Sequence, residues 1–281
     1  MSTITSRPPL RTTAAWPIEF GMECFGVRLG IRCQNPSIGP LLERRLAPGR
    51  KPTVFDPSGP HFSLVGEEAP SLYFNRRRIA CADSWEEAVE LLESRMQIFI
   101  GEHAPGLVFL HAGVVRWRQA CLIIPGRSFS GKSTLVAALL QERAEYLSDE
   151  FAVIDAGGNI HPYPRLVSLR RPGRSTNLRA SAESMGGTVA QGPARPGVIL
   201  LTHYRPLKVW SPRRASPSEA ILQLARHCLP IRSRPSESLD ALIALVKRTQ
   251  VFAGDRGDTA DMIPRLAALL DEEEKQPHAI R

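Results

Sequence analysis

The stretch that decides the fold is residues 121–134, which read CLIIPGRSFSGKST. A short apolar run leads directly into Gly126–Ser133, which satisfies the pattern G-x-x-x-x-G-K-[ST], and an alanine- and leucine-rich stretch follows. This order of residues predicts a buried strand, a glycine-rich phosphate-binding loop and a helix over 132–143. The stretch therefore predicts an α/β fold with a nucleotide site at the end of a strand.

The chemistry of this loop follows from its glycines. Where a side chain is missing, backbone N–H groups can turn toward phosphate oxygens, and the next helix presents its positive N-terminal end to the same anion. We expect Lys132 to reach the β- and γ-phosphates of ATP and to act in catalysis, and the Ser133 hydroxyl to help ligate Mg²⁺. The expected nucleotide-binding residues are Gly126, Ser128, Ser130, Gly131, Lys132, Ser133 and Thr134.

Two adjacent acids open the apolar run that follows the predicted helix. Asp149 and Glu150 come sixteen residues after Ser133, where a helix and a short turn return the chain to the sheet. One carboxylate suits Mg²⁺, which prefers oxygen ligands, and the other suits a proton acceptor for an attacking hydroxyl. Adjacent residues point opposite ways on a regular strand, so both acids reach one substrate only through a turn or bulge. The alternative is a solvated strand entry.

A histidine and two groups of arginines are further candidates. His111 lies in an apolar run before the loop, where a lone histidine is more often a core residue than a catalytic one. Guanidinium groups suit phosphate oxygens, so at least one arginine of a crowded stretch is expected near the γ-phosphate. This stretch contains Arg165, Arg170, Arg171, Arg174 and Arg179. Arg205, Arg213 and Arg214 are weaker candidates for recognising an acidic substrate.

Composition narrows the class of protein. The net charge of +8, from 36 basic and 28 acidic residues, favours an anionic ligand, and no zinc spacing or basic-aromatic array supports nucleic acid. Five scattered cysteines form no C-x-x-C pair, which predicts reduced thiols in the cytoplasm. No stretch approaches the roughly 18 apolar residues of a membrane-spanning helix, so we expect no membrane partner.

The chain divides into three parts by pattern. Residues 1–17 are polar, basic and proline-containing, and are predicted to be disordered. Residues 18–100 combine short strand patterns with a helix that opens at the capping box of Ser84 and Glu87, which predicts a small β-rich lobe. Residues 101–275 contain the loop, further strands and C-terminal helices, and predict the nucleotide-binding domain.

Three motifs at these spacings resemble the HPr kinase/phosphorylase superfamily: LHAGVV at 110–115, IIPGRSFSGKST at 123–134 and YLSDEFAVI at 146–154. The nearest resemblance is to HPr-kinase-related serine kinases, including those of lasso-peptide maturation, and it covers about residues 99–210. It implies a P-loop kinase domain of the HPr kinase and phosphoenolpyruvate carboxykinase type, with the loop in a mixed sheet. It further implies that Asp149 accepts the proton of a substrate serine, that His111 lies near the transferred phosphate, and that Glu150 occupies the neighbouring acidic position, where aspartate is usual. With Asp149 as the base, Ser133 and Glu150 are the expected metal ligands.

The resemblance has departures that bear on the substrate. Thr134 stands where HPr kinases commonly have glutamate, and the glycine-rich signature after the acidic pair has no counterpart. HPr itself is therefore not the expected acceptor. We expect an ATP-dependent, Mg²⁺-assisted kinase that phosphorylates a hydroxyl, chiefly serine, of a peptide or small protein. Because relatives of this type often form oligomers, a homo-oligomer is also expected. A small-metabolite kinase and a non-catalytic ATP-binding regulator remain alternatives.

Overall fold

A computed structural model describes residues 16–118, 120–127, 130–169 and 178–275. The chain forms two compact units, Met1–Pro105 and Gly106–Arg281, and each is described by itself. The predicted disordered segment 1–17 lies outside the described residues except for its last two positions, and Ser128, Arg170, Arg171 and Arg174 lie outside them altogether.

The first unit is built on a six-stranded sheet. Its strands are β1 (Ile18–Cys24), β2 (Val27–Cys33), β3 (Lys51–Thr53), β4 (His61–Val65), β5 (Ser71–Phe74) and β6 (Arg77–Cys81), in the order β3-β1-β2-β4-β5-β6. Neighbouring strands are antiparallel except β2 and β4, which are parallel. Phe25 and Gly26 form the turn of the β1–β2 hairpin, and both residues have positive φ.

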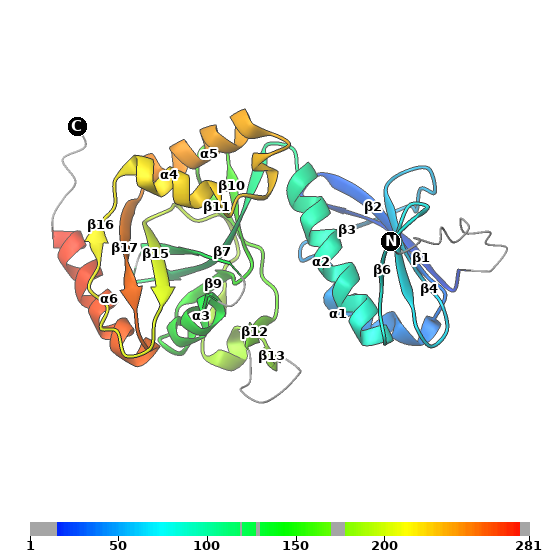
Figure 1. The fold of residues 1–281 in the computed structure, drawn as a ribbon, viewed down its shortest axis with the longest axis horizontal. Helices are drawn as coiled ribbons and strands as arrows, with labels where there is room; N and C mark the ends of the chain where they lie inside the picture. Colours follow the sequence, from blue (N-terminus) through cyan, green and yellow to red (C-terminus); the bar gives the residue numbers. More distant parts are fainter. Residues whose placement is uncertain (1–15, 119, 128–129, 170–177, 276–281) are drawn as a thin grey trace, which may run out of the picture. The chain divides into compact units, whose positions relative to one another are not determined.

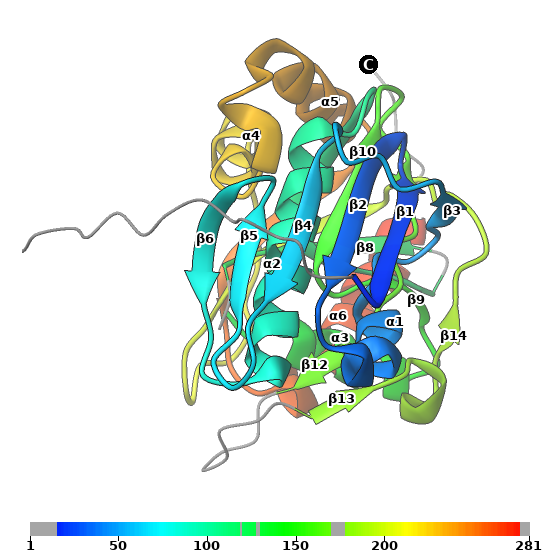
Figure 2. The same ribbon diagram turned by 90° about the vertical axis from the view of Figure 1, so that its right-hand side faces the viewer.

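Two α-helices cover one face of this sheet. They are α1 (Gly39–Arg45) and α2 (Trp85–His103), and a short 3-10 helix, η1 (Pro36–Ile38), precedes α1. Ser84 caps α2 as its sequence predicts, because its hydroxyl accepts the N–H of Glu87 at 3.2 Å. Figure 2 shows both helices behind the strands, and α2 packs against β4 and β5.

The second unit is built on a nine-stranded mixed sheet. Seven strands follow the order β11-β10-β7-β8-β15-β17-β16, and β9 pairs with both β7 and β14. Their bounds are β7 (Leu107–Trp117), β8 (Ala120–Pro125), β9 (Glu145–Ser148), β10 (Phe151–Asp155), β11 (Ile160–His161), β14 (Thr188–Val189), β15 (Val198–Tyr204), β16 (Arg213–Arg214) and β17 (Gln250–Arg256). A separate hairpin consists of β12 (Val167–Leu169) and β13 (Leu178–Ala180).

Helices cover both faces of this sheet (Figure 1). On one face α3 (Lys132–Gln141) and α6 (Thr259–Lys275) contribute Leu135, Leu139 and Met262 to one apolar core. On the other face α4 (Pro217–Ala225) and α5 (Pro235–Lys247) contribute Leu224 and Leu242 to a second core. The 3-10 helices η2 (Glu183–Met185) and η3 (Leu229–Ile231) are the remaining helical elements of the described chain. The second unit is thus a three-layer α/β/α structure.

The centre of this sheet determines where a ligand site forms. Strand β15 lies between β8 and β17 and is parallel to both, so the carboxyl ends of all three strands meet at one edge. Ligand sites of open α/β sheets lie at the carboxyl ends of such strands. The glycine loop leaves β8 at this edge.

The predicted α/β class with a mixed sheet is confirmed. Pro264 lies inside α6. No helix in the described ranges is both long enough and apolar enough to cross a bilayer.

Candidate active site

The glycine loop connects β8 to α3 and closes against the end of β17. Gly131 is the N-cap of α3 and has a φ of 81°, a left-handed conformation that favours glycine. A Cβ atom at this position would also lie 2.5 Å from Nη2 of Arg256. The left-handed turn into α3 therefore favours glycine here, and the missing side chain lets Arg256 approach the loop closely.

Lys132 points back into the loop that precedes it. Its Nζ donates to the backbone oxygens of Gly126 at 2.8 Å and Arg127 at 3.1 Å, and lies 3.3 Å from Nε2 of His111. The side chain is buried, and burial lowers the pKa of Lys132, although Glu150 and Asp149 act in the opposite direction. The ammonium group is held where the loop begins, beside the histidine of the first motif.

Arg256 holds the loop from its other side. It is only 2% exposed, and its Nη2 donates to the backbone oxygens of Gly131 at 2.9 Å and Ser130 at 3.4 Å. The guanidinium carbon lies 5.5 Å from the centre of the Tyr204 ring, and burial lowers the pKa of Arg256. Because N–H and C=O of a trans peptide point opposite ways, these two bonds turn the N–H groups of Gly131 and Lys132 away from Arg256.

The acidic pair lies in a bend between β9 and β10. The Ser148 hydroxyl accepts the N–H groups of Glu150 at 3.1 Å and Phe151 at 2.9 Å, which closes the bend. The sequence requires a turn or bulge at this point if both acids are to face one site, and this bend supplies it. The two carboxylates then lie in different surroundings.

Asp149 is the inner acid. It is 5% exposed, and its two oxygens accept the Tyr146 hydroxyl at 2.9 Å and the Ser168 N–H at 3.2 Å. The Ser133 hydroxyl also donates to this carboxyl. Burial raises the pKa of Asp149, and these hydrogen bonds oppose the rise. The acid is thus tied to the first turn of α3.

Glu150 is the outer acid. Its side chain is 38% exposed, and Oε1 lies 3.4 Å from Nε2 of His111. His111 reaches this position because β7 pairs with β10 in the register that sets His111 opposite Phe151. The same imidazole nitrogen lies near Lys132, so the structure brings His111, Lys132 and Glu150 together.

His227 adds a second imidazole beside these groups. Its backbone oxygen accepts the N–H of His111 at 2.8 Å, which ties the end of α4 to β7. The pKa of His227 is lowered to about 4, first by burial and then by four nearby basic groups, among them His111 and Lys132. The other two are Arg127 and Arg226.

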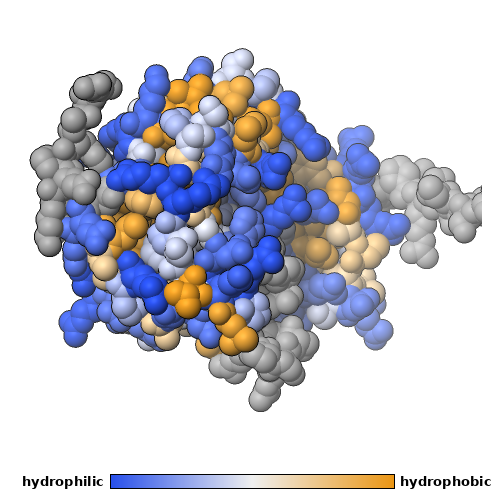
Figure 3. Space-filling view, turned by 60° about the vertical axis from the view of Figure 1, so that its left-hand side comes forward, coloured by the Kyte–Doolittle hydropathy of each residue, from blue (hydrophilic) through white to orange (hydrophobic). Residues whose placement is uncertain are grey.

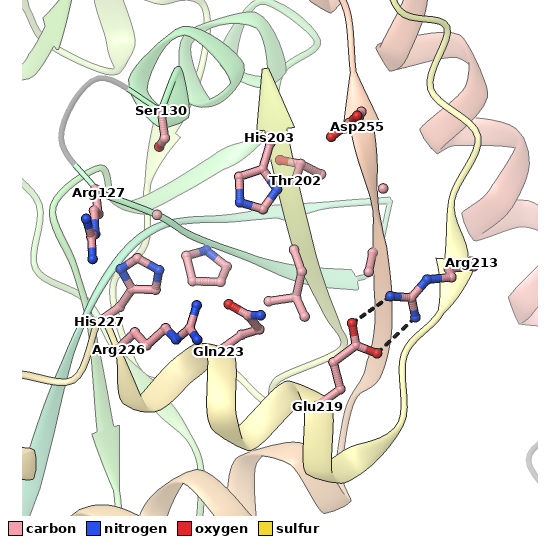
Figure 4. Close-up of a pocket in the computed structure, with 15 residues that line it drawn as sticks. Arg127, Ser130, Thr202, His203, Arg213, Glu219, Gln223, Arg226, His227 and Asp255 are labelled. Atoms are coloured by element: carbon pink, nitrogen blue, oxygen red, sulfur yellow. Dashed lines mark hydrogen bonds and ion pairs between the residues drawn. The ribbon is translucent and has the colours of Figure 1, made fainter. Parts of the chain in front are cut away.

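A cavity of about 610 Å³ opens beside the beginning of the loop. Figure 4 shows residues of its walls: Arg127 and Ser130 of the loop, residues at the ends of β15 and β17, and Gln223 and Arg226 at the end of α4. Arg213 and Glu219 form a two-bond ion pair at 2.9 and 2.6 Å in the far wall. His227 lies on the side of the cavity where the loop begins.

The other candidate residues are exposed or already have partners within the protein. Thr134 is exposed on the first turn of α3. Arg205 pairs with Asp255 at 2.8 Å, Arg213 pairs with Glu219, and Arg214 lies over the Phe252 ring, so all three have partners within the protein. Of the crowded arginine stretch, Arg165 and Arg179 are described; the Arg165 backbone donates to the Tyr146 hydroxyl.

The donor set fits Mg²⁺ better than a softer metal. No group of three or more His, Cys, Asp or Glu side chains that could hold a metal occurs among the described residues. The Ser133 hydroxyl and the carboxylates of Asp149 and Glu150 supply hard oxygen donors beside the loop. Mg²⁺ is typically held by one or two carboxylates together with waters and substrate phosphates, which matches this set.

Sequence reasoning missed Arg256, His227 and Tyr146. Arg256 and His227 are distant from the loop in sequence. The order of strands in the sheet brings Arg256 to the loop, and the end of α4 brings His227 to it. Tyr146 lies inside the third motif beside the buried Leu147 and Ser148, so a position in the core was its simplest interpretation. The chain matches no protein family model, and no curated protein matches it.

Proposed function

We propose that this protein is an ATP-dependent phosphotransferase with a P-loop kinase domain of the HPr kinase type. One observation carries the proposal: two buried cations, Lys132 and Arg256, enclose the glycine loop. Among the described residues neither has a carboxylate within ion-pair distance, and both donate to backbone carbonyls. A buried charge is costly unless an opposite charge compensates it. The polyphosphate of a nucleotide supplies such a charge.

The bend at the acidic pair separates this proposal from simple anion binding. Two carboxylates beside a phosphate site repel the anion unless a metal or a reacting hydroxyl lies between them. Mg²⁺, when bound, neutralises charge that develops on the phosphate oxygens. Ser133 and Asp149 are placed to hold it, because the hydroxyl and the carboxyl already contact each other.

The proton acceptor in this proposal is Glu150. Asp149 is nearly buried, whereas the Glu150 side chain is 38% exposed and adjoins His111. A base must reach the proton it abstracts, so accessibility favours Glu150. The family resemblance implies the opposite distribution, with Asp149 as base and Glu150 at the metal. The two assignments can be distinguished by substitution, because removing the base changes the pH profile of the reaction, whereas removing the metal ligand changes its Mg²⁺ requirement.

The proposed reaction is a single displacement. The acceptor hydroxyl oxygen forms a bond to the γ-phosphorus of ATP, and the bond from that phosphorus to the β,γ-bridging oxygen breaks. The hydroxyl proton moves to the carboxylate, and ADP leaves with the electron pair of the broken bond. Lys132 and His111 lie where negative charge increases on the transferred group.

The acceptor follows partly from the cavity beside the loop. On the family resemblance, the leading acceptor is a serine of a peptide or small protein. The cavity of about 610 Å³ supports a second candidate, a small hydroxylated metabolite, because clefts and cavities of this size suit small molecules. Arg127 and Arg226 at its rim favour an acceptor with an anionic group.

The test is incubation with Mg-ATP and two panels, serine-containing peptides and small hydroxylated metabolites, read by the mass gain of one phosphate. Lys132→Met should abolish this mass gain.

Glu150→Gln should lower kcat by about 10²- to 10⁴-fold and remove the acidic limb of its pH profile. Asp149→Asn should instead raise the Mg²⁺ concentration that the reaction requires. Loss of the acidic limb in Asp149→Asn alone would reverse the two roles. ATP binding without transfer to any acceptor would favour the non-catalytic regulator.

A further inference from the structure

The loop fixes the direction in which a bound nucleotide runs. In such loops the lysine reaches the β- and γ-phosphates, and backbone N–H groups cradle the α- and β-phosphates. Lys132 Nζ lies beside the oxygens of Gly126 and Arg127, so the γ end is where the loop begins. The α-phosphate then lies where the loop enters α3, beyond Gly131, and the nucleoside continues outward from there.

Tyr204 stands at that end of the loop. A Cβ atom on Gly131 would lie 3.8 Å from Cβ of Tyr204, and the ring of Tyr204 lies over Arg256, which holds the Gly131 carbonyl. The ring is kept in place by its hydroxyl, which donates to Asp258 at 3.0 Å. An aromatic side chain that is 46% exposed therefore borders the exit of the phosphate chain.

The residues after Tyr204 form a turn that exposes further apolar side chains. Leu207 is 97% exposed and Val209 is also exposed, while Trp210 beyond them is buried. Arg205 N–H donates to the Arg256 oxygen at 2.8 Å, and Lys208 N–H donates to the Arg205 oxygen at 3.3 Å. The turn is held against the end of β17, which limits its freedom to collapse and hide its apolar side chains.

Two backbone features show how tightly this turn is held. A Cβ atom on Gly257 would lie 2.0 Å from the Lys208 oxygen, so only glycine allows the two segments to touch. Leu207 has a φ of 62°, a left-handed conformation that is uncommon for a branched apolar residue. Strain of this kind persists where the surroundings fix it, and it is typical of ligand-binding segments.

We propose that the segment Tyr204–Val209 is the nucleoside-binding loop, with the Tyr204 ring and the Leu207 side chain contacting the base. This inference rests on the proposed function, because it places the rest of the same nucleotide. A flat base suits an aromatic ring and a few exposed apolar side chains. On the face that Figure 3 brings forward, apolar residues form small groups among polar ones.

The test compares two probes, Mg-ATP and Mg-tripolyphosphate, which share the phosphate chain but differ in the nucleoside. Leu207→Asn removes the apolar side chain and keeps a residue that tolerates positive φ. Tyr204→Ala removes the ring. Each variant should weaken Mg-ATP binding about 5- to 100-fold, the range for loss of a base contact, and leave tripolyphosphate binding unchanged. Leu222→Ser, on the exposed side of α4, is the matched control and should change neither affinity.

Two results would overturn the assignment. Equal weakening of both probes would mean that the segment supports the phosphate loop and does not contact a base. Weakening of Mg-ATP alone by Gln223→Ala, with Leu207→Asn unaffected, would place the nucleoside in the cavity beside α4. If the unmodified protein bound neither probe, the proposed function itself would fail, which is a separate outcome.

Discussion

Arg256 is a buried charged residue, and the backbone of the glycine loop is its main hydrogen-bond partner. Its hydrogen bonds go to the carbonyls of Ser130, Gly131 and Gly257, and its Nε has no partner among the described residues. A guanidinium in such a place lowers the stability of the empty protein and gains its compensation when an anion occupies the loop. The folding free energy and the nucleotide affinity are therefore coupled through this one side chain.

We predict that Arg256→Met leaves the melting temperature of the free protein unchanged or raises it, because replacing a buried charge by an apolar group is often neutral or stabilising. The same substitution should weaken Mg-ATP binding about 10- to 100-fold, the equivalent of about 1.4 to 2.8 kcal/mol. Differential scanning fluorimetry with and without Mg-ATP measures both effects. Arg256→Lys keeps the charge but loses the forked donors of the guanidinium group. Its Mg-ATP affinity should therefore lie between those of the unmodified protein and Arg256→Met. A lower melting temperature with an undiminished Mg-ATP response would show a purely structural role.

His227 lies among cations, which makes its protonation sensitive to a bound anion. Its pKa of about 4 leaves the imidazole neutral at pH near 6, whereas in an unfolded chain, with the usual pKa of about 6.5, most of it is protonated. Its contribution to stability is thus complete above about pH 6.5 and is lost as the pH falls toward about 4. A phosphate beside Lys132 favours the protonated form and raises this pKa.

We predict that the protein takes up a fraction of a proton at His227 when Mg-ATP binds near pH 5, about one unit above the pKa of this imidazole in the free protein. Calorimetric titrations in buffers of different ionisation enthalpy measure the number of protons exchanged. His227→Gln should take up fewer protons than the unmodified protein, and His203→Gln, in the same cavity wall, is the control. Identical proton counts for His227→Gln and the unmodified protein would place the phosphates away from this imidazole.

At the scale of elements, the contact between α3 and β7 sets the distance from the loop to His111. A Cβ atom on Gly113 of β7 would lie 2.7 Å from Cγ2 of Val136 on α3, so this glycine allows the helix to pack close to the strand. Lys132 and His111 meet because the two elements are this near. The glycine of the first motif is therefore explained by packing.

We predict that Gly113→Ala destabilises the protein by about 1–3 kcal/mol, because it over-packs this contact. Val136→Ala costs stability by itself through the cavity that it leaves. The double variant should lose less than the sum of the two, because the new methyl occupies space that the valine leaves. Urea unfolding of all four proteins measures the coupling. Strict additivity would show that α3 moves away without contacting the new methyl group.

The sequence predicted elements best where a pattern was continuous. Strands β10 and β15 have the ends that their apolar runs indicate, because strands of a sheet covered by helices on both faces consist largely of consecutive apolar residues. Strand β17 went unpredicted, since Gln250–Arg256 has few consecutive apolar residues before Gly254 and Asp255 interrupt them. Helix α1 was also missed, because Gly39 and Pro40 open it in a segment whose residues favour turns.

The site was predictable only as far as local motifs extend. The loop, the acidic pair and His111 come from short patterns whose physical chemistry is local. Arg256 could not be found in this way, because its link to the loop depends on β17 lying beside β15, two strands from β8. The different burial of Asp149 and Glu150 likewise depends on the bend that Ser148 closes and on the hairpin that supplies Ser168.

At the scale of the whole molecule, the two units have separate cores. The first buries Ile31, Leu64 and Leu92 between its sheet and α2, and the second buries its two clusters on either side of its own sheet. Every residue assigned to phosphate, base or proton transfer lies after Pro105. Nucleotide binding is therefore a property of the second unit in this proposal.

We predict that a fragment beginning at Gly106 folds and binds Mg-ATP within about threefold of the whole chain, because a unit of this size can bury its own core. Calorimetry on both proteins gives the two affinities, and cooperative urea unfolding of the fragment shows that it is folded. The Lys132→Met form of the fragment is the control for binding at the loop. A cooperatively folded fragment that fails to bind Mg-ATP, while the whole chain binds it, would mean that residues before Gly106 complete the nucleotide site.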